Sequence, residues 1–199
     1  MEHVQAVPKI LSLAPGAKPW QREPQRREPR QGGRLMDLTI GGVLLALVAV
    51  GLAGGSGIRA ARRHCMLGEH HFNKQEYAEA VEEFSVSLAH HPQCVDAYFN
   101  RGAAYIHLGH FQEAVDDLDR ALELAPRSPK VLFNRCIAFM KLMQLDRALT
   151  DIDHALIRDP HFARAYLARA LIQDQLGNQQ RAQEEYARAV QLEAALRRQ

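Results

Sequence analysis

Residues 95–128 read VDAYFNRGAAYIHLGHFQEAVDDLDRALELAPRS, and the same pattern of small, apolar and polar residues returns 34 positions later. Pro92, Pro126 and Pro160 are 34 residues apart. Other residues keep the same step, among them Ala80, Ala114, Ala148 and Ala182, and Leu88, Leu122, Leu156 and Val190. Several registers with a single period indicate an array of structural repeats.

Within each unit the apolar residues fall at helical spacing in two runs. A turn separates the runs near Gly109, Met143 and Gly177, and a proline closes the unit. Each unit is therefore predicted to be a helix, a short turn and an antiparallel helix. The sequence predicts an all-α solenoid of about four repeats, at residues 61–94, 95–128, 129–162 and 163–196.

The residues that define the second unit are Tyr98, Gly102, Tyr105, Gly109, Phe111, Ala114, Leu118, Ala121 and Pro126. This pattern resembles the tetratricopeptide repeat family, in which small residues lie where paired helices approach closely and large ones fill the gaps. The first and last units depart from it, with His71 and Gln173 where the family has aromatic residues. Such departures are expected, because the outer faces of terminal repeats meet water. The resemblance covers about residues 61–199 and is specific for the fold, much less so for function.

The chain before the repeats has a different composition. Residues 1–36 contain five prolines and many basic residues, which predicts a disordered tail. A mitochondrial transit peptide is the alternative, although Glu23 and Glu28 among the arginines and the prolines argue against a clean amphipathic helix. Translation starting at Met36 would remove most of this tail.

Residues 38–58 contain no charge, and a helix of this length spans roughly 30 Å. A transmembrane helix is therefore predicted over residues 37–59, followed by the repeat domain at 60–199. A buried helix of a water-soluble domain and a removed signal peptide are the alternatives. Gly51 and Gly55 form a GxxxG pair, which suggests a homodimer contact, although glycines are common in membrane helices generally.

Cys65 follows this segment closely and lies beside Arg62 and Arg63. A juxtamembrane cysteine next to basic residues suggests S-palmitoylation, and the alternative is a plain thiol on the first repeat helix.

The composition excludes several functional classes. Lys and Arg number 25 and Asp and Glu number 23, which argues against a dedicated nucleic-acid-binding protein. The ten histidines show no HExxH motif and the cysteines no CxxC motif, so no metal site is predicted. The sequence shows no Ser/His/Asp or Cys/His arrangement typical of nucleophilic catalysis, and no glycine-rich loop that would bind a phosphate. We therefore predict that the protein is not an enzyme and binds no cofactor.

The family resemblance implies a binding groove lined by the first helix of each pair. Asn100 and Asn134 recur at the 34-residue step and are predicted to hold the backbone of an extended peptide. The predicted residues lining the same groove are Phe99, Phe133, His107, Lys130, Lys141 and Arg164. The alternative is that these residues belong to the structural consensus of the repeat. The arginines at 101, 135 and 169 are predicted to pair with acids of the second helices, such as Asp117 and Asp151.

One use of this fold is a clamp for the terminal carboxylate of a chaperone tail. Asn100 and Lys130 match two of the clamp positions, whereas Cys65, Glu69 and Asn134 stand at the others. A glutamate there repels an anionic ligand, so an intact clamp is not expected.

The orientation across the membrane is indicated by two opposing signals. Basic residues are slightly more numerous before residues 38–58 than after them, which favours a cytosolic N-terminus. Three unpaired cysteines and the absence of an N-x-S/T sequon instead favour cytosolic repeats, the orientation predicted here. The segment is similar to signal-anchors of mitochondrial outer-membrane receptors, and the endoplasmic reticulum is the alternative location.

The predicted function is a single-pass, membrane-anchored adaptor that binds a protein or peptide partner. The first alternative is a structural or assembly subunit of a larger membrane complex. The second is a co-chaperone-like or import-receptor-like protein. The repeat fold serves many partners and many biological processes.

Overall fold

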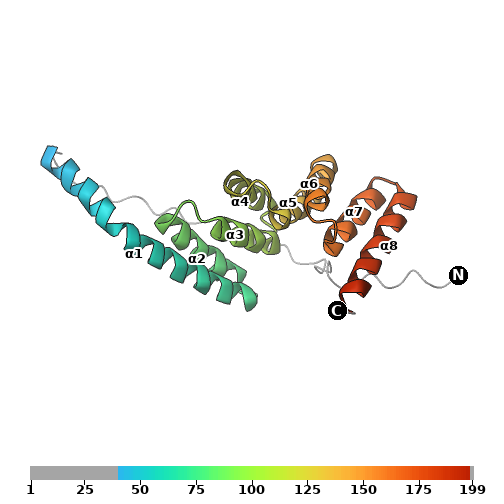
Figure 1. Ribbon diagram of the computed structural model, residues 1–199, viewed down its shortest axis with the longest axis horizontal. Helices are drawn as coiled ribbons and strands as arrows, with labels where there is room; N and C mark the ends of the chain where they lie inside the picture. The colour runs from blue at the N-terminus through green and yellow to red at the C-terminus, as the bar shows by residue number, and fades with distance from the viewer. Residues whose placement is uncertain (1–39, 198–199) are drawn as a thin grey trace, which may run out of the picture.

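The computed structural model describes residues 40–197, and it describes side chains from residue 57 onward. In this range the chain is all-helical, with eight helices that pair into four antiparallel hairpins (Figure 1). The helices are α1 (Ile40–Asn73), α2 (Tyr77–His90), α3 (Val95–Leu108), α4 (Phe111–Leu124), α5 (Pro129–Lys141), α6 (Leu145–Arg158), α7 (Ala163–Gln175) and α8 (Gln179–Leu196). The predicted helical repeats are confirmed.

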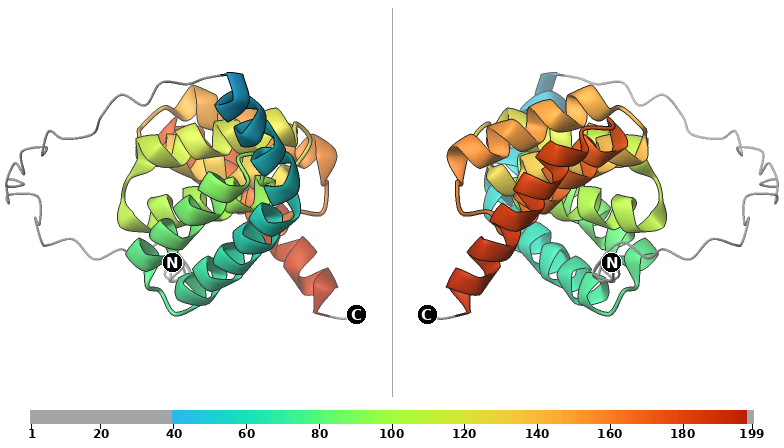
Figure 2. Two further views of the ribbon diagram at one scale, coloured as in Figure 1. Left: turned by 90° about the vertical axis from the view of Figure 1, so that its left-hand side faces the viewer. Right: turned by 90° about the vertical axis from the view of Figure 1, so that its right-hand side faces the viewer.

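The hairpins follow one another along the long axis of the molecule, from α1 at one end to α8 at the other (Figure 1). Seen from the two ends, successive helices are rotated relative to their neighbours, so the array winds as a superhelix (Figure 2). Each hairpin contacts only the hairpins next to it in the sequence. This is the nearest-neighbour stacking of a solenoid.

The two helices of a hairpin approach closely because a small residue faces a large one. A Cβ atom at Gly68 would lie 2.6 Å from the ring of Phe84, and one at Gly102 would lie 2.9 Å from Leu118 Cγ. Both large side chains are fully buried. Cys136 occupies the equivalent place in the third repeat and is also fully buried. Glycine is needed here for close packing, not for an unusual backbone conformation.

The turns inside the hairpins lie at the predicted positions and use left-handed backbone conformations. Gly109 and Gly177 both have φ of 81°, and Met143 has φ of 58° at the equivalent position. Met143 therefore adopts a conformation that costs a residue with a side chain about 1–2 kcal/mol. The turn of the first repeat does the same at Gln75, with φ of 64°.

The second helix of the last repeat, α8 (Gln179–Leu196), is more exposed than the second helices of the repeats before it. Tyr186 is 44 % exposed and Val190 is 49 % exposed. Leu118 and Leu156, which belong to the same two registers in earlier repeats, are 0 % and 6 % exposed. The reason is that the next hairpin covers each earlier second helix, whereas α8 has no following helix among the described residues.

Helix α1 is longer than any other helix of the described chain and projects beyond α2 (Figure 1). It runs without interruption through the predicted boundary between residues 59 and 60. No helix in the part of the chain that the structure describes is both long and apolar enough to cross a membrane. Residues 1–39 and the side chains of 40–56 lie outside the description, so the tail, the membrane span and the Gly51–Gly55 contact stay predictions.

Candidate functional site

The odd-numbered helices form one continuous surface of the array, here called the inner surface. Helix α1 contacts α3, α3 contacts α5, and α5 contacts α7. The even-numbered helices make no such contacts with one another in the described chain. In a curved stack the elements on the inside of the curve lie closer together, so the odd-numbered helices line the concave side.

The two predicted backbone-binding asparagines lie on adjacent helices of this surface. Asn100 on α3 is partly exposed, and its amide donates a hydrogen bond of 3.3 Å to Glu69 Oε1 on α1. Asn134 on α5 is partly exposed too, and among the described residues its side chain has no hydrogen-bond partner. The structure therefore places both amides in the predicted register, one of them already engaged.

The two predicted phenylalanines are both partly buried and pack against core clusters. Phe99 packs against the cluster that contains Leu118 and Val131, and Phe133 packs against the cluster that contains Cys136 and Ile172. Phe133 also lies 5.0 Å, centroid to centroid, from Phe162, and the Arg164 guanidinium lies 5.7 Å from the Phe133 ring. Both residues thus contribute to packing, and Phe133 in addition joins an aromatic and cationic patch between α5 and α7.

His107 belongs to a group of stacked rings at the other end of the inner surface. Its ring lies parallel to that of Tyr77 with centroids 4.3 Å apart, and it meets Phe72 edge to face at 5.5 Å. Burial lowers the pKa of His107 below its usual value, because the charged form is less well solvated. The imidazole is therefore neutral at pH 7 and presents a ring rather than a charge.

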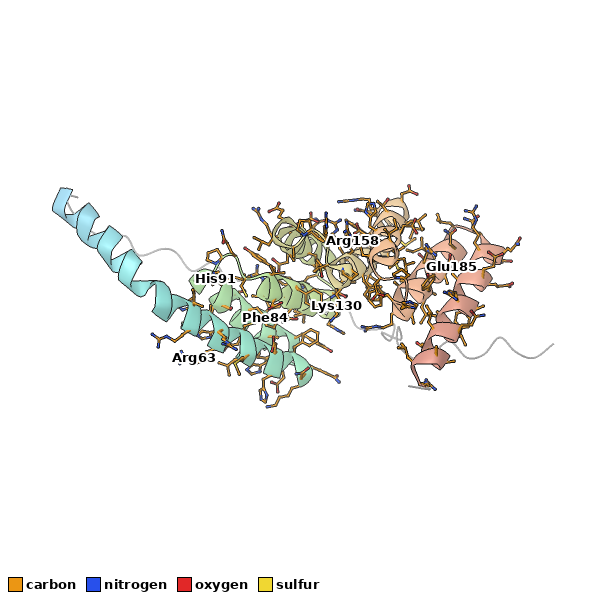
Figure 3. The ribbon with its side chains drawn as sticks, viewed as in Figure 1. Arg63, Phe84, His91, Lys130, Arg158 and Glu185 are labelled. Carbon is orange, nitrogen blue, oxygen red and sulfur yellow. The ribbon has the colours of Figure 1, made fainter. Side chains whose placement is uncertain are left out.

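The predicted basic residues occupy the α5–α7 end. Lys130 lies in the first turn of α5, Lys141 is its last residue, and Arg164 lies in the first turn of α7; all three are exposed (Figure 3 labels Lys130). None of the three forms an ion pair with a residue that the structure describes. Their charges are available to a ligand.

Cys65, the predicted lipidation site, is only 8 % exposed. Its thiol lies 3.8 Å from Glu69 Oε1. Burial, together with the nearby charges of Glu69, Cys94 and Asp96, raises the pKa of Cys65 to about 12. The thiolate needed for acylation is therefore scarce at neutral pH.

The arginines at 101, 135 and 169 form a ladder between the helix layers. Arg135 makes two hydrogen bonds to Asp151, of 2.7 and 2.8 Å, and a third to Asp119 on the preceding hairpin. Arg101 makes two bonds of 2.7 Å to Asp117 and a third, of 2.9 Å, to Ser85. The predicted pairs with Asp117 and Asp151 are confirmed.

The bond that each arginine makes to the preceding hairpin was not predicted from the sequence. Asp119, Asp153 and Ser85 lie 16 residues before their arginines, as the confirmed partners lie 16 residues after them. A search for acids at both spacings would have found the first two. In the fourth repeat Glu185 replaces aspartate, and Arg169 Nε is buried without a hydrogen-bond partner in the described chain.

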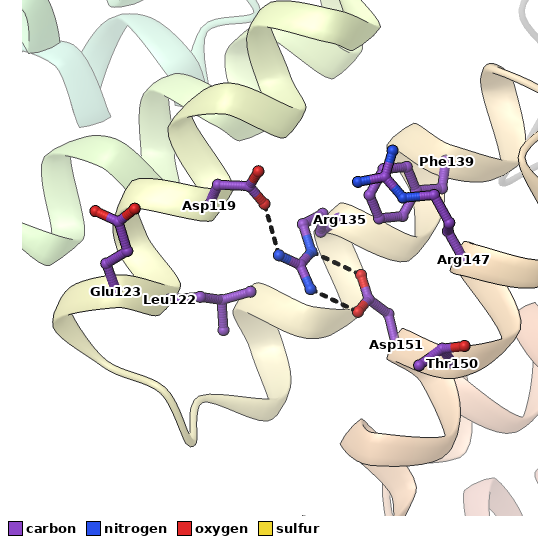
Figure 4. Close-up of a pocket in the computed structure, with 8 residues that line it drawn as sticks. All are labelled: Asp119, Leu122, Glu123, Arg135, Phe139, Arg147, Thr150 and Asp151. Carbon is purple, nitrogen blue, oxygen red and sulfur yellow. Dashed lines mark hydrogen bonds and ion pairs between the residues drawn. The ribbon is translucent and has the colours of Figure 1, made fainter.

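A pocket of about 520 Å³ lies beside this ladder, between α4, α5 and α6 (Figure 4). Its walls include Arg135, Asp151, Thr150 and Phe139, and the Arg147 guanidinium lies 4.0 Å from the Phe139 ring centroid. Asp151 is held by Arg135, so it is not poised as a base. No group of three metal-ligating side chains occurs within the described residues. We therefore interpret the pocket as the solvent-accessible side of a structural ion pair.

Comparison with known proteins agrees with this architecture. Two family models described as tetratricopeptide repeat match residues 67–135 and 135–198. A search of curated proteins finds no match.

Solved structures with similar folds include MamA from Desulfovibrio magneticus RS-1, with a TM-score of 0.65 and 18 % identity over 78 % of this chain and 88 % of that one. The Arabidopsis OM64 TPR domain has a TM-score of 0.59 and 23 % identity, over 60 % of this chain and 98 % of that domain. The first TPR of Spaghetti (RPAP3), bound to the HSP90 peptide SRMEEVD, has a TM-score of 0.59 and 24 % identity, over 60 % of this chain and 95 % of that one. At these identities the likeness shows the fold alone.

Proposed function

Because the chain belongs to the tetratricopeptide repeat family, we propose that it is a non-enzymatic adaptor that binds an extended segment of a partner protein along its inner surface. The observation that carries the proposal is the row of accessible polar, aromatic and basic side chains on α3, α5 and α7. Three of them, Asn134, Lys130 and Lys141, form no hydrogen bond or ion pair with a side chain that the structure describes, unlike the arginines of the ladder.

Asn100 and Asn134 hold the peptide backbone, since each amide offers one acceptor and two donor hydrogens. Packed helices lie about 8–10 Å apart and an extended chain advances about 3.3 Å per residue. Successive asparagines therefore read backbone groups about three residues apart. Lys130 and Arg164 receive acidic side chains or carbonyl oxygens of the same segment.

Site-specific photo-crosslinking tests this assignment. A photoreactive residue at His107 or Lys141 captures a partner in cells, and combining it with Asn100→Ala and Asn134→Ala abolishes that capture. Gln112→Ala, on the outer helix α4, is the matched control and leaves capture unchanged. Capture that survives the loss of both asparagines refutes backbone binding through the inner surface.

Binding of an acidic chaperone tail is not part of the proposal. The Spaghetti structure contains the peptide SRMEEVD. In the present chain Glu69 lies beside Asn100, where a bound carboxylate would meet a negative charge. We expect SRMEEVD to bind the full chain at least tenfold more weakly than a partner segment does, as measured by fluorescence anisotropy.

The membrane context is a separate proposal, supported by the uncharged residues 38–58. This segment anchors the chain in one pass and leaves the repeats in the cytosol, at the mitochondrial outer membrane or the endoplasmic reticulum. Protease added to intact, fractionated organelles should digest the repeats without detergent. Protection of the repeats until detergent is added would reverse the orientation.

A permanently docked assembly subunit is the alternative function. Native size analysis separates the two, because an adaptor shows a free pool, whereas an assembly subunit runs almost entirely in one large species.

A further inference from the structure

We propose that the α1–α3 end of the inner surface is a subsite for a lysine or arginine side chain of the bound segment, with Glu69 as its counter-charge. This inference rests on the proposed function and adds the chemistry of the ligand to it. The bound segment is then bipolar, with a basic residue at the α1–α3 end and acidic residues at the α5–α7 end.

Glu69 is an exposed carboxylate that neutral donors hold in place. Its Oε1 accepts hydrogen bonds from the Asn100 amide, at 3.3 Å, and the Cys65 thiol, at 3.8 Å. No lysine, arginine or histidine of the described chain lies within 4.0 Å of this carboxylate. Hydrogen bonds from neutral donors orient the Glu69 carboxylate without cancelling its negative charge, so Glu69 remains able to pair with a cation.

A second carboxylate reinforces the negative field. Asp96, in the first turn of α3, also forms no ion pair within the described residues. The negative charges of Glu69 and Asp96 both raise the pKa of the buried Cys65 thiol, so both carboxylates contribute to the field at this end of the inner surface. Arg62 lies seven residues before Glu69 on α1, so about two helical turns, roughly 10 Å, separate the two.

A group of aromatic rings lies one helical turn from Glu69. Phe72 lies three residues after Glu69 on α1 and therefore one turn away on the same face. Its ring meets Tyr77 at 5.4 Å and His107 at 5.5 Å. Such rings pack against the aliphatic stem of a lysine or arginine and attract its charged end. A carboxylate one helical turn from a group of aromatic rings favours a long cationic side chain over a small polar one.

The opposite end of the inner surface carries the opposite charge. Lys130, Lys141 and Arg164 are exposed and unpaired within the described chain. A segment bound in one direction satisfies both ends, whereas the same segment reversed brings like charges together at both. The charge pattern thus selects the ligand and its direction.

A peptide display selection on the full chain in detergent micelles tests the subsite. Random decapeptides selected on the wild-type chain should carry lysine or arginine at one fixed position. Replacing that residue by alanine should weaken binding about tenfold for the wild type and less than twofold for Glu69→Gln. Selection on Glu69→Lys should enrich aspartate or glutamate at the same position.

Glu82→Gln is the matched control, because Glu82 is an exposed carboxylate on the outer helix α2. It should leave the preference for a basic residue intact, and circular dichroism should show both glutamine variants folded. Selected peptides without a basic position, or a tenfold loss that persists in Glu69→Gln, overturn the subsite and leave the adaptor function standing. Failure to select any peptide sensitive to Asn100→Ala and Asn134→Ala overturns the proposed function itself.

Discussion

Replacing Arg135 by methionine should strongly destabilise the array. The substitution keeps an unbranched apolar stem but removes the guanidinium that makes three hydrogen bonds to Asp151 and Asp119. The Asp151 side chain is only 5 % exposed, whereas that of Asp119 is 43 % exposed. Almost the whole cost therefore comes from leaving the Asp151 charge buried without its partner.

The size of the effect follows from these exposures. Removing one partner of a fully buried ion pair costs about 3–5 kcal/mol. Here Asp151 lines the pocket beside Arg135, where water can solvate it once the guanidinium is removed, so we expect a smaller loss, about 2–3 kcal/mol in the free energy of unfolding. For a chain of this size that corresponds to a fall in Tm of about 5–10 °C. Arg135→Lys keeps the charge but not the paired geometry and should lose about 1 kcal/mol.

Urea denaturation followed by far-UV circular dichroism measures these differences. Arg120→Met is the matched control, because Arg120 is 64 % exposed in its pair with Glu123, and it should produce no measurable change. Equal midpoints for Arg135→Met and Arg120→Met would show that the ladder contributes nothing, and the assignment of these arginines to the scaffold would be wrong.

Three further predictions concern the same packing. Ser85→Asp places a carboxylate beside Arg101, as Asp119 and Asp153 do beside the next two arginines of the ladder, and should raise the free energy of unfolding by about 0.5 kcal/mol in urea denaturation. A fall in this free energy would contradict the equivalence of the three positions. Gly102→Ala should cost about 1–2 kcal/mol in the same assay, because the new Cβ would lie 2.9 Å from a buried leucine; a gain would mean that helix propensity outweighs the clash. In the native chain iodoacetamide should alkylate Cys94 before Cys65 and Cys136, whose burial raises their pKa, and mass spectrometry of the modified peptides reads the order. Equal rates at all three cysteines would contradict the burial of Cys65 and Cys136, whereas a fast reaction at Cys65 alone would mean that α1 opens readily, and acyl-exchange labelling of the Cys65 peptide would then become the direct test of lipidation.

The hairpins could be predicted from the sequence because one period governs the turns, the close contacts and the core together. Gly109 and Met143 occupy the same turn although their residue types differ, and 34-residue spacing identifies Met143 where composition alone does not. The same spacing aligned Arg101 and Arg135 with their acids on the following helix. Contacts between the two helices of one repeat can therefore be predicted from the sequence.

Contacts between repeats were harder to predict. The bond from Arg135 to Asp119 and the bond from Asn100 to Glu69 both join different hairpins. Their geometry depends on the angle at which one hairpin stacks on the next, and a periodic sequence is compatible with a range of such angles. Helix α1 illustrates a related point, because it continues through the glycines at positions 54, 55 and 57 although glycine lowers helix propensity.

The continuity of α1 has a mechanical consequence for any partner held on the inner surface. Each residue of a helix adds about 1.5 Å and the i to i+4 hydrogen bonds resist bending, so one uninterrupted helix transmits direction from end to end. Helix α1 carries Cys65 and Glu69 near its C-terminal end and reaches Ile40 at the other. Whatever holds residues 38–58 therefore also orients the first repeat and, through nearest-neighbour stacking, the whole inner surface. An adaptor with a flexible linker searches space for its partner, whereas an adaptor built on one rigid helix presents its binding surface at a fixed angle.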